Sequence, residues 1–106
     1  MKAANDAVPC FMPDTNCLVA LLLPQHEHHE RAFREMERRL DDGERLAIAA
    51  HTLVETYAVL TRFPSPHRLS SVDCRTLIEA NFFGDGVTLC TLPAEAYREL
   101  IRDAPE

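Results

Sequence analysis

The stretch FMPDTNCLVALLLP, residues 11–24, decides how the chain folds. It is an apolar run that is interrupted by a single acid, Asp14, with the polar residues Thr15 and Asn16 beside it. An aspartate has no favourable role inside an apolar segment, because burying an unpaired charge is costly. Asp14 therefore either starts a helix or is held at the end of a strand to do chemistry.

The residues on either side of this acid predict a strand and a helix. AVPCFMP (7–13) is apolar on both faces and too short for a helix, so we expect a buried strand. TNCLVALLLP (15–24) is predicted to be a short buried helix, which Thr15 or Asn16 can cap and Pro24 stops. The acid would then lie where the strand passes into the helix.

An amphipathic helix is predicted over residues 26–44, and the glycine of DDG (41–43) is expected to end it. Phe33, Met36 and Leu40 recur at helical spacing along one side. The other side carries acid–arginine pairs four residues apart, which stabilise exposed helices. These pairs are Glu27 with Arg31, Glu30 with Arg34 and Glu35 with Arg39.

The rest of the chain continues the alternation of strands and helices. The predicted elements are a strand at 45–50, a helix at 51–63, a helix at 71–83 with Ser70 as its cap, a strand at 87–92 and a helix at 94–103. We expect the last helix to pack through Tyr97, Leu100 and Ile101. The order β-α-α-β-α-α-β-α implies an α/β fold, with a parallel sheet sandwiched by helices.

The composition is that of one ordinary folded domain. The 106 residues are 46% hydrophobic and 26% charged. The formal net charge of −6 argues against binding nucleic acid by charge alone, although acids that hold a divalent cation would fit it. The four cysteines form no C-x-x-C pair, and we expect buried free thiols in a reducing cytoplasm. Since no apolar run is long enough for a secretory or membrane-spanning segment, a cytoplasmic protein is expected.

Two acids are predicted to meet at one edge of the sheet. Asp14 directly follows the first strand, and Glu55 lies one turn into the helix after the second strand. Ligands of open parallel sheets collect beyond the carboxyl ends of the strands, so both side chains can face one crevice. Two bare carboxylates about 4 Å apart repel by roughly 4 kcal/mol at an effective dielectric of about 20. A divalent cation such as Mg²⁺ would remove that repulsion.

Both acids also have structural interpretations, which spacing alone leaves open. TLVE (52–55) fits a capping box, in which Thr52 caps the helix and Glu55 is its partner three residues on. Asp14 can equally begin the first helix.

Two longer stretches resemble the PIN-domain ribonucleases, in particular the VapC-type toxins of toxin–antitoxin pairs. PDTNCLVALLLPQHEHHERA (13–32) is similar to the opening strand, the D-T-N and the first helix of that family. AAHTLVETYAVLTRFPSPHRLS (49–70) is similar to the strand and the acid-bearing helix that follow. The D-T-N by itself is a weak signal, whereas the two stretches in this order are more specific, and the resemblance covers essentially the whole chain in element order.

The resemblance implies roles for four residues. Asp14 and Glu55 are similar to the first and second metal-binding acids of the family. Asn16 or Thr15 is similar to the polar residue that supports the first acid and the metal-bound water. The implied activity is a toxin's endonucleolytic cleavage of RNA by metal-activated water, with Mg²⁺ or Mn²⁺ as the cofactor. The expected partners are RNA, a cognate antitoxin protein and a second copy of the chain in a homodimer. No association with a membrane is expected.

The sequence departs from the family pattern after its final helix. In the family a further segment brings a third acid and often a fourth, and this sequence stops at Glu106 before that segment would begin. Neither Asp85 nor Asp103 matches those acids. We therefore expect residues 1–106 to form a single PIN-like domain that lacks its last elements, with the first strand at an edge of the sheet. The alternative function is a non-catalytic PIN-like module that binds an antitoxin or dimerises without cleaving RNA.

Two further clusters are interpreted as solvated surface. The histidines of QHEHH (25–29) fit a helix start better than a metal site. Arg31, Arg34 and Arg38 form a stripe that could touch RNA phosphate, but the interleaved glutamates favour a paired, exposed face.

Overall fold

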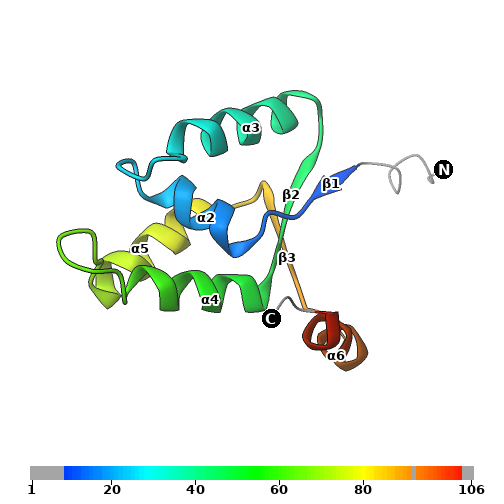
Figure 1. The fold of residues 1–106 in the computed structure, drawn as a ribbon. Helices are drawn as coiled ribbons and strands as arrows, with labels where there is room; N and C mark the ends of the chain where they lie inside the picture. Colours follow the sequence, from blue (N-terminus) through cyan, green and yellow to red (C-terminus); the bar gives the residue numbers. More distant parts are fainter. Residues whose placement is uncertain (1–8, 92, 104–106) are drawn as a thin grey trace.

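Helices flank a parallel sheet, in the order that the sequence predicts (Figure 1). The structure is a computed structural model, and it describes residues 9–91 and 93–103. The strands are β1 (Cys10–Phe11), β2 (Arg45–Ala49) and β3 (Val87–Cys90), which pair in parallel in the order β1-β2-β3. The helices are α2 (Thr15–Leu22), α3 (His29–Asp41), α4 (Ala50–Leu60), α5 (Ser71–Phe82) and α6 (Ala94–Asp103). The predicted α/β class is confirmed.

Strand β1 is shorter and more exposed than predicted. Only Cys10 and Phe11 belong to it, opposite Arg45 and Leu46 of β2. Cys10 is exposed and Phe11 is half-buried, so the prediction of a buried strand is wrong. The physical reason is position, because β1 is an edge of the sheet within the described residues, as expected. The first two residues of the predicted strand lie outside the described part of the chain.

The core forms around the central strand. β2 lies between β1 and β3, and its last four residues are all buried, which suits an unbroken apolar run. Helices α2 and α4 pack on each other, and α4 also packs on β2 and α5. The most deeply buried side chains are Leu18, Ile48, Thr56, Leu60 and Cys74. This packing gives the starts of α2 and α4 a rigid base.

Two amphipathic helices are less buried than predicted. Helix α3 starts at His29, and none of its 13 residues is buried. Met36 packs against the core, whereas Phe33 and Leu40 are 47% and 45% exposed. On α6, Ile101 is 78% exposed, so the predicted packing is wrong for this residue, whereas the side chains of Tyr97 and Leu100 lie outside the described part of the structure. In Figure 1, α6 lies beyond β3 and apart from the other helices.

Local signals at two helix ends are confirmed. The hydroxyl of Ser70 accepts the Asp73 N–H at 3.0 Å and caps α5. Gly43 follows α3 at φ +87°, a conformation that L side chains rarely adopt. No helix within the described ranges is long and apolar enough to span a membrane.

The four cysteines carry thiols rather than disulfides, as predicted, and Cys74 is the buried one among them. Burial raises the pKa of its thiol. Cys17 and Cys90 are half-buried and Cys10 is exposed, so the expectation of uniformly buried thiols is wrong. Cys10 lies on the edge strand, which explains its exposure.

Candidate active site at the start of helix α2

Asp14 lies where β1 passes into α2 and is the N-cap of that helix. Its Oδ1 accepts a hydrogen bond from the Cys17 N–H at 2.9 Å, which satisfies one of the free amides of the first turn. The predicted cap at Thr15 or Asn16 is wrong, because the acid one residue earlier takes that position. The carboxylate is exposed, and its Oδ2 accepts no hydrogen bond from the described residues. One oxygen therefore caps the helix, and the other is open to a ligand.

Glu55 reaches the same helix start from α4. The Thr15 hydroxyl donates to its Oε1 at 3.1 Å, across 40 residues of sequence. Helix α4 begins at Ala50, directly after β2, so Thr52 is the third helical residue and is buried. The capping-box interpretation is therefore wrong, because Thr52 lies inside the helix, where its carbonyl accepts the Thr56 hydroxyl at 2.7 Å. Glu55 lies in the second turn and stays exposed.

The parallel sheet explains why these elements meet. β1 and β2 run in the same direction, so their carboxyl ends lie at one edge, and α2 and α4 both start there. At this edge Asp14 caps α2, and the Thr15 hydroxyl next to it in the sequence contacts Glu55. Carboxylate and hydroxyl oxygens are ligands that suit a hard divalent cation. Within the part of the chain that is described, no group of three or more His, Cys, Asp or Glu side chains is placed to hold a metal.

The pKa of the Cys17 thiol is raised at this helix start. Burial raises its pKa, and the carboxylates of Asp14 and Glu35 raise it further. Glu35 is a residue whose place beside this site the sequence did not predict. Its only signal was a four-residue spacing from Arg39, which describes an ordinary exposed helix.

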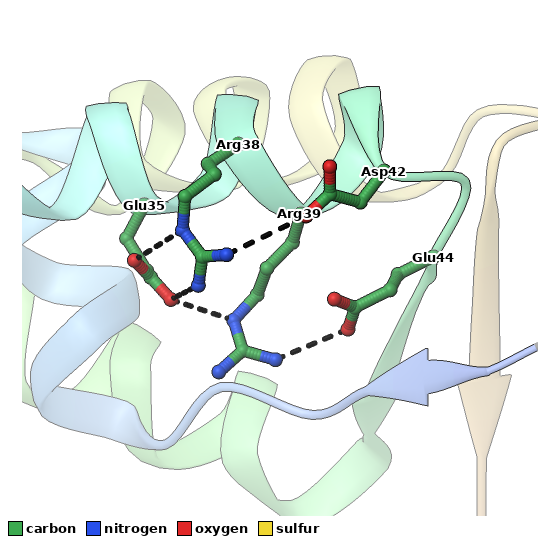
Figure 2. Close-up of polar contacts among 5 residues, drawn as sticks. All are labelled: Glu35, Arg38, Arg39, Asp42 and Glu44. Atoms are coloured by element: carbon green, nitrogen blue, oxygen red, sulfur yellow. Dashed lines mark hydrogen bonds and ion pairs between the residues drawn. The ribbon is translucent and has the colours of Figure 1, made fainter.

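Glu35 is the centre of an ion-pair network that ties α3 to the sheet (Figure 2). Arg38 donates to both of its carboxylate oxygens, at 3.2 and 2.6 Å, and Arg39 donates to it at 2.8 Å. These hydrogen bonds, that of Arg38 first, lower the pKa of Glu35 to about 2. Arg39 also donates to Glu44 at 3.1 Å, and its guanidinium carbon lies 5.4 Å from the centre of the Phe11 ring in β1. The network thus contacts the strand that leads into the candidate site.

Two cavities flank the start of α2. The smaller has a volume of about 450 Å³ and is lined by Asp14, Glu35 and Arg39 among others. The larger has a volume of about 660 Å³ and extends from Asn16 to the end of α4. Cys17, Ala32 and Glu35 line both cavities, so the two cavities adjoin each other.

The clustered histidines precede or begin α3 and do not form a metal site with other described residues. His29 is hydrogen-bonded through Nδ1 to the Ala20 carbonyl at 2.9 Å, which fastens the start of α3 to α2. The His28 N–H donates to Nδ1 of His26 at 3.0 Å. The prediction of a helix start is confirmed for His29.

Comparison with known proteins gives this arrangement a family. The family model described as the PIN domain matches residues 11–104, which is most of the chain and includes both candidate acids. The chain belongs to the PIN-domain family. The resemblance inferred from the two sequence stretches is therefore confirmed.

Several relatives of this PIN domain carry VapC names. It is 47% identical over 60 residues to Ribonuclease VapC40 of Mycobacterium tuberculosis, a match that covers 57% of this chain and 40% of that protein. It is 32% identical over 74 residues to Ribonuclease VapC27 of the same organism, covering 70% and 50%. This PIN domain thus spans half or less of the length of these relatives.

A solved structure supports the same fold. The crystal structure of Mycobacterium tuberculosis VapC20, a sarcin-ricin loop cleaving toxin, superposes with a TM-score of 0.63. The match covers 92% of this chain and 71% of that one, at 20% sequence identity. At this identity the likeness establishes the fold alone.

Proposed function

We propose that this PIN domain is a metal-dependent endoribonuclease of the VapC toxin type, which hydrolyses RNA phosphodiesters. The observation that carries the proposal is the hydrogen bond from Thr15 to Glu55 at 3.1 Å. It joins the acid of α4 to the helix that Asp14 caps, so that two exposed carboxylates serve one edge of the sheet. The similarity to two proteins named ribonucleases supports the same activity.

Asp14 and Glu55 would hold Mg²⁺ or Mn²⁺. Their exposed carboxylates are the hard oxygen donors that these ions prefer, and Asp14 keeps Oδ2 free of hydrogen bonds to the described residues. A bound ion would supply Lewis-acid chemistry, by activating water and neutralising phosphate charge. Thr15 orients Glu55 through its hydroxyl, and Asn16 lines the larger cavity. The partners in this proposal are RNA, a cognate antitoxin and a second copy of the chain, in the cytoplasm.

The alternative is a non-catalytic module that binds an antitoxin or dimerises without cutting RNA. One observation favours it, because no third acid joins Asp14 and Glu55 in a metal-binding group among the described residues. Two carboxylates alone bind a divalent ion more weakly than a larger set of oxygen ligands.

The test is the substitution Glu55→Gln. The amide keeps an oxygen that can accept the Thr15 hydroxyl, but it removes the charge that would hold the ion. RNA cleavage in Mg²⁺ or Mn²⁺ should fall on the order of 100-fold, and the melting temperature should hardly change, because the side chain is exposed. Mn²⁺-induced broadening of NMR signals at the start of α2 should also weaken.

Glu37→Gln is the matched control, because it makes the same change at an exposed position of α3. Cleavage at an equal rate in EDTA, or in the Glu55→Gln variant, would contradict the enzymatic proposal. Absence of cleavage by the wild-type chain, together with antitoxin binding, would establish the alternative.

A further inference from the structure

We infer that the larger cavity binds one nucleotide of the RNA, next to the phosphodiester that lies at the acids. We call it the α2–α4 cavity, and the residues that carry the argument are Asn16, His26, His28, Arg31, Val59 and Phe63. The inference rests on the proposed function and deepens it, because it names a substrate-binding region beyond the two carboxylates.

The cavity adjoins the candidate site. Asn16 lines it, only two residues after Asp14. On the other wall, Val59 lies one helical turn after Glu55, on the same side of α4, and Phe63 follows the end of that helix. A volume of about 660 Å³ falls in the range of roughly 300–1,000 Å³ that is usual for small-molecule sites. A nucleotide held here would lie beside a phosphate bound at the acids.

The lining of the cavity suits a nucleobase. Val59 and the half-buried ring of Phe63 give it an apolar wall, and aromatic rings are common stacking platforms for the bases of single-stranded RNA. Because Nδ1 of His26 accepts the His28 N–H, the neutral His26 ring carries its proton on Nε2. The cavity therefore combines a surface for stacking with a hydrogen-bond donor.

Arg31 supplies the positive charge that a phosphate needs. Its predicted partner, Glu27, precedes α3 and pairs instead with His28 at 3.4 Å, so the predicted pair is wrong. Among the described residues Arg31 forms no ion pair, whereas Arg34 and Arg38 of the same helix do. Arg31 can therefore donate to a phosphate without breaking an existing contact.

One of the two acids that line the cavity is already compensated, because Glu35 is held by Arg38 and Arg39. The other, Glu27, lies beside the His28 ring at 3.4 Å. A separate apolar cavity of about 390 Å³, which Phe33 lines, has no Arg or Lys among its described lining residues. The combination of aromatic ring, donor and free cation thus distinguishes the α2–α4 cavity as the site for a nucleotide.

The experiment measures binding of an RNA tetranucleotide in EDTA, where metal-dependent cleavage is off. NMR titration should shift the signals of His26, Arg31 and Phe63. Arg31→Gln and Phe63→Leu should each weaken binding by about fivefold or more. Their matched controls are Arg34→Gln on the same helix and Phe83→Leu at an exposed position outside the cavity, which should stay within about twofold of the wild type. In Mg²⁺, the two cavity variants should raise KM for RNA cleavage more than they lower kcat.

Equal effects of the cavity and control variants, or shifts confined to another face, would overturn the inference. Concentration-dependent shifts of the cavity signals without RNA would also overturn it, because a second copy would then occupy the cavity. If the Phe63→Leu variant unfolds, the inference is tested by comparing the RNA affinities of the Arg31→Gln and Arg34→Gln variants. RNA binding in the cavity without cleavage by the wild-type chain in Mg²⁺ or Mn²⁺ would support the inference while the proposed enzymatic function fails.

Discussion

At the scale of single residues, Asp14 combines an observed structural role with the chemical role that we propose for it. Its Oδ1 accepts the Cys17 N–H, and this bond sets where α2 begins. The partial positive charge at the start of the helix also favours an anionic side chain there, which makes the acid a stable cap. The same bond holds the carboxylate at the sheet edge that Thr15 and Glu55 share.

Two substitutions separate these roles of Asp14. Asp14→Asn keeps an oxygen for the cap, so the free energy of unfolding should change by no more than about 0.5 kcal/mol, whereas Asp14→Ala should lose about 1 kcal/mol. Both should abolish metal-dependent RNA cleavage, because neither side chain binds Mg²⁺ well. Denaturant unfolding and an RNA-cleavage assay check this. Wild-type cleavage by the Asp14→Asn variant would remove Asp14 from the mechanism, and equal stability of the two variants would remove its capping role.

At the scale of elements, α3 is held by ion pairs more than by burial. Its apolar residues Phe33 and Leu40 remain about half exposed, while Glu35 and Arg39 link it to β1 and to the start of β2 (Figure 2). Exposed ion pairs are individually weak, but here one carboxylate accepts hydrogen bonds from two arginines. The position of α3 should therefore depend on the charge of that carboxylate.

This dependence predicts a pH effect on stability. The pKa of Glu35 falls from its ordinary value of 4.5 to about 2 in the folded chain. Since the folded pKa is the lower one, its stabilising contribution is present above about pH 4.5 and is lost as the pH falls toward 2. Glu35→Gln should thus lower the melting temperature near neutral pH, and the difference from wild type should shrink below pH 4.5.

Thermal melts of the wild type and the Glu35→Gln variant across this pH range provide the measurement. High salt should reduce the difference, because the network is exposed. Glu37→Gln, on the same helix, is the control for loss of a carboxylate. A difference that stays constant down to pH 2 would mean that the charge of Glu35 does not hold α3.

At the scale of the whole molecule, the described sheet leaves its first strand at an edge. Within the described residues β1 pairs with β2 alone, and Met12 directly after it is 50% exposed. Exposed edges and apolar patches both drive association between chains.

We therefore expect residues 1–106 expressed alone to associate through β1 rather than to remain monomeric. Light scattering should show a mass that rises with concentration. Met12→Lys should reduce this association, because a charged lysine at a strand edge opposes pairing. Val72→Lys, at an exposed apolar position on α5, should not. A stable monomer that cleaves RNA in Mg²⁺ would show that the exposed edge does not drive association and that the two acids are enough for catalysis.

Local chemistry was sufficient for the sequence to determine the order of the elements and several of their ends. The Ser70 cap and the glycine after α3 depend on groups a few residues away, so their effect does not depend on the rest of the fold. The sequence also predicted the strand-to-helix junction at Asp14, from the polar residues that interrupt an apolar run. It predicted the parallel α/β class from the alternation of strands and helices. The resemblance of two stretches to PIN domains added the prediction that Asp14 and Glu55 serve one site, which composition and spacing had left open.

Only the tertiary structure decided which of the competing local roles each residue plays. Glu55 could have been a capping-box partner, but β2 runs directly into α4 at Ala50 and places Glu55 in the second turn, against Thr15. Glu27 and Arg31 have the spacing of a helical pair, but α3 starts after Glu27, which leaves Arg31 at the mouth of a cavity. The physical reason is that spacing defines neighbours only inside a helix whose start is known. Those starts are set by long-range packing of the helices on the sheet, whose energy exceeds that of any single cap or ion pair.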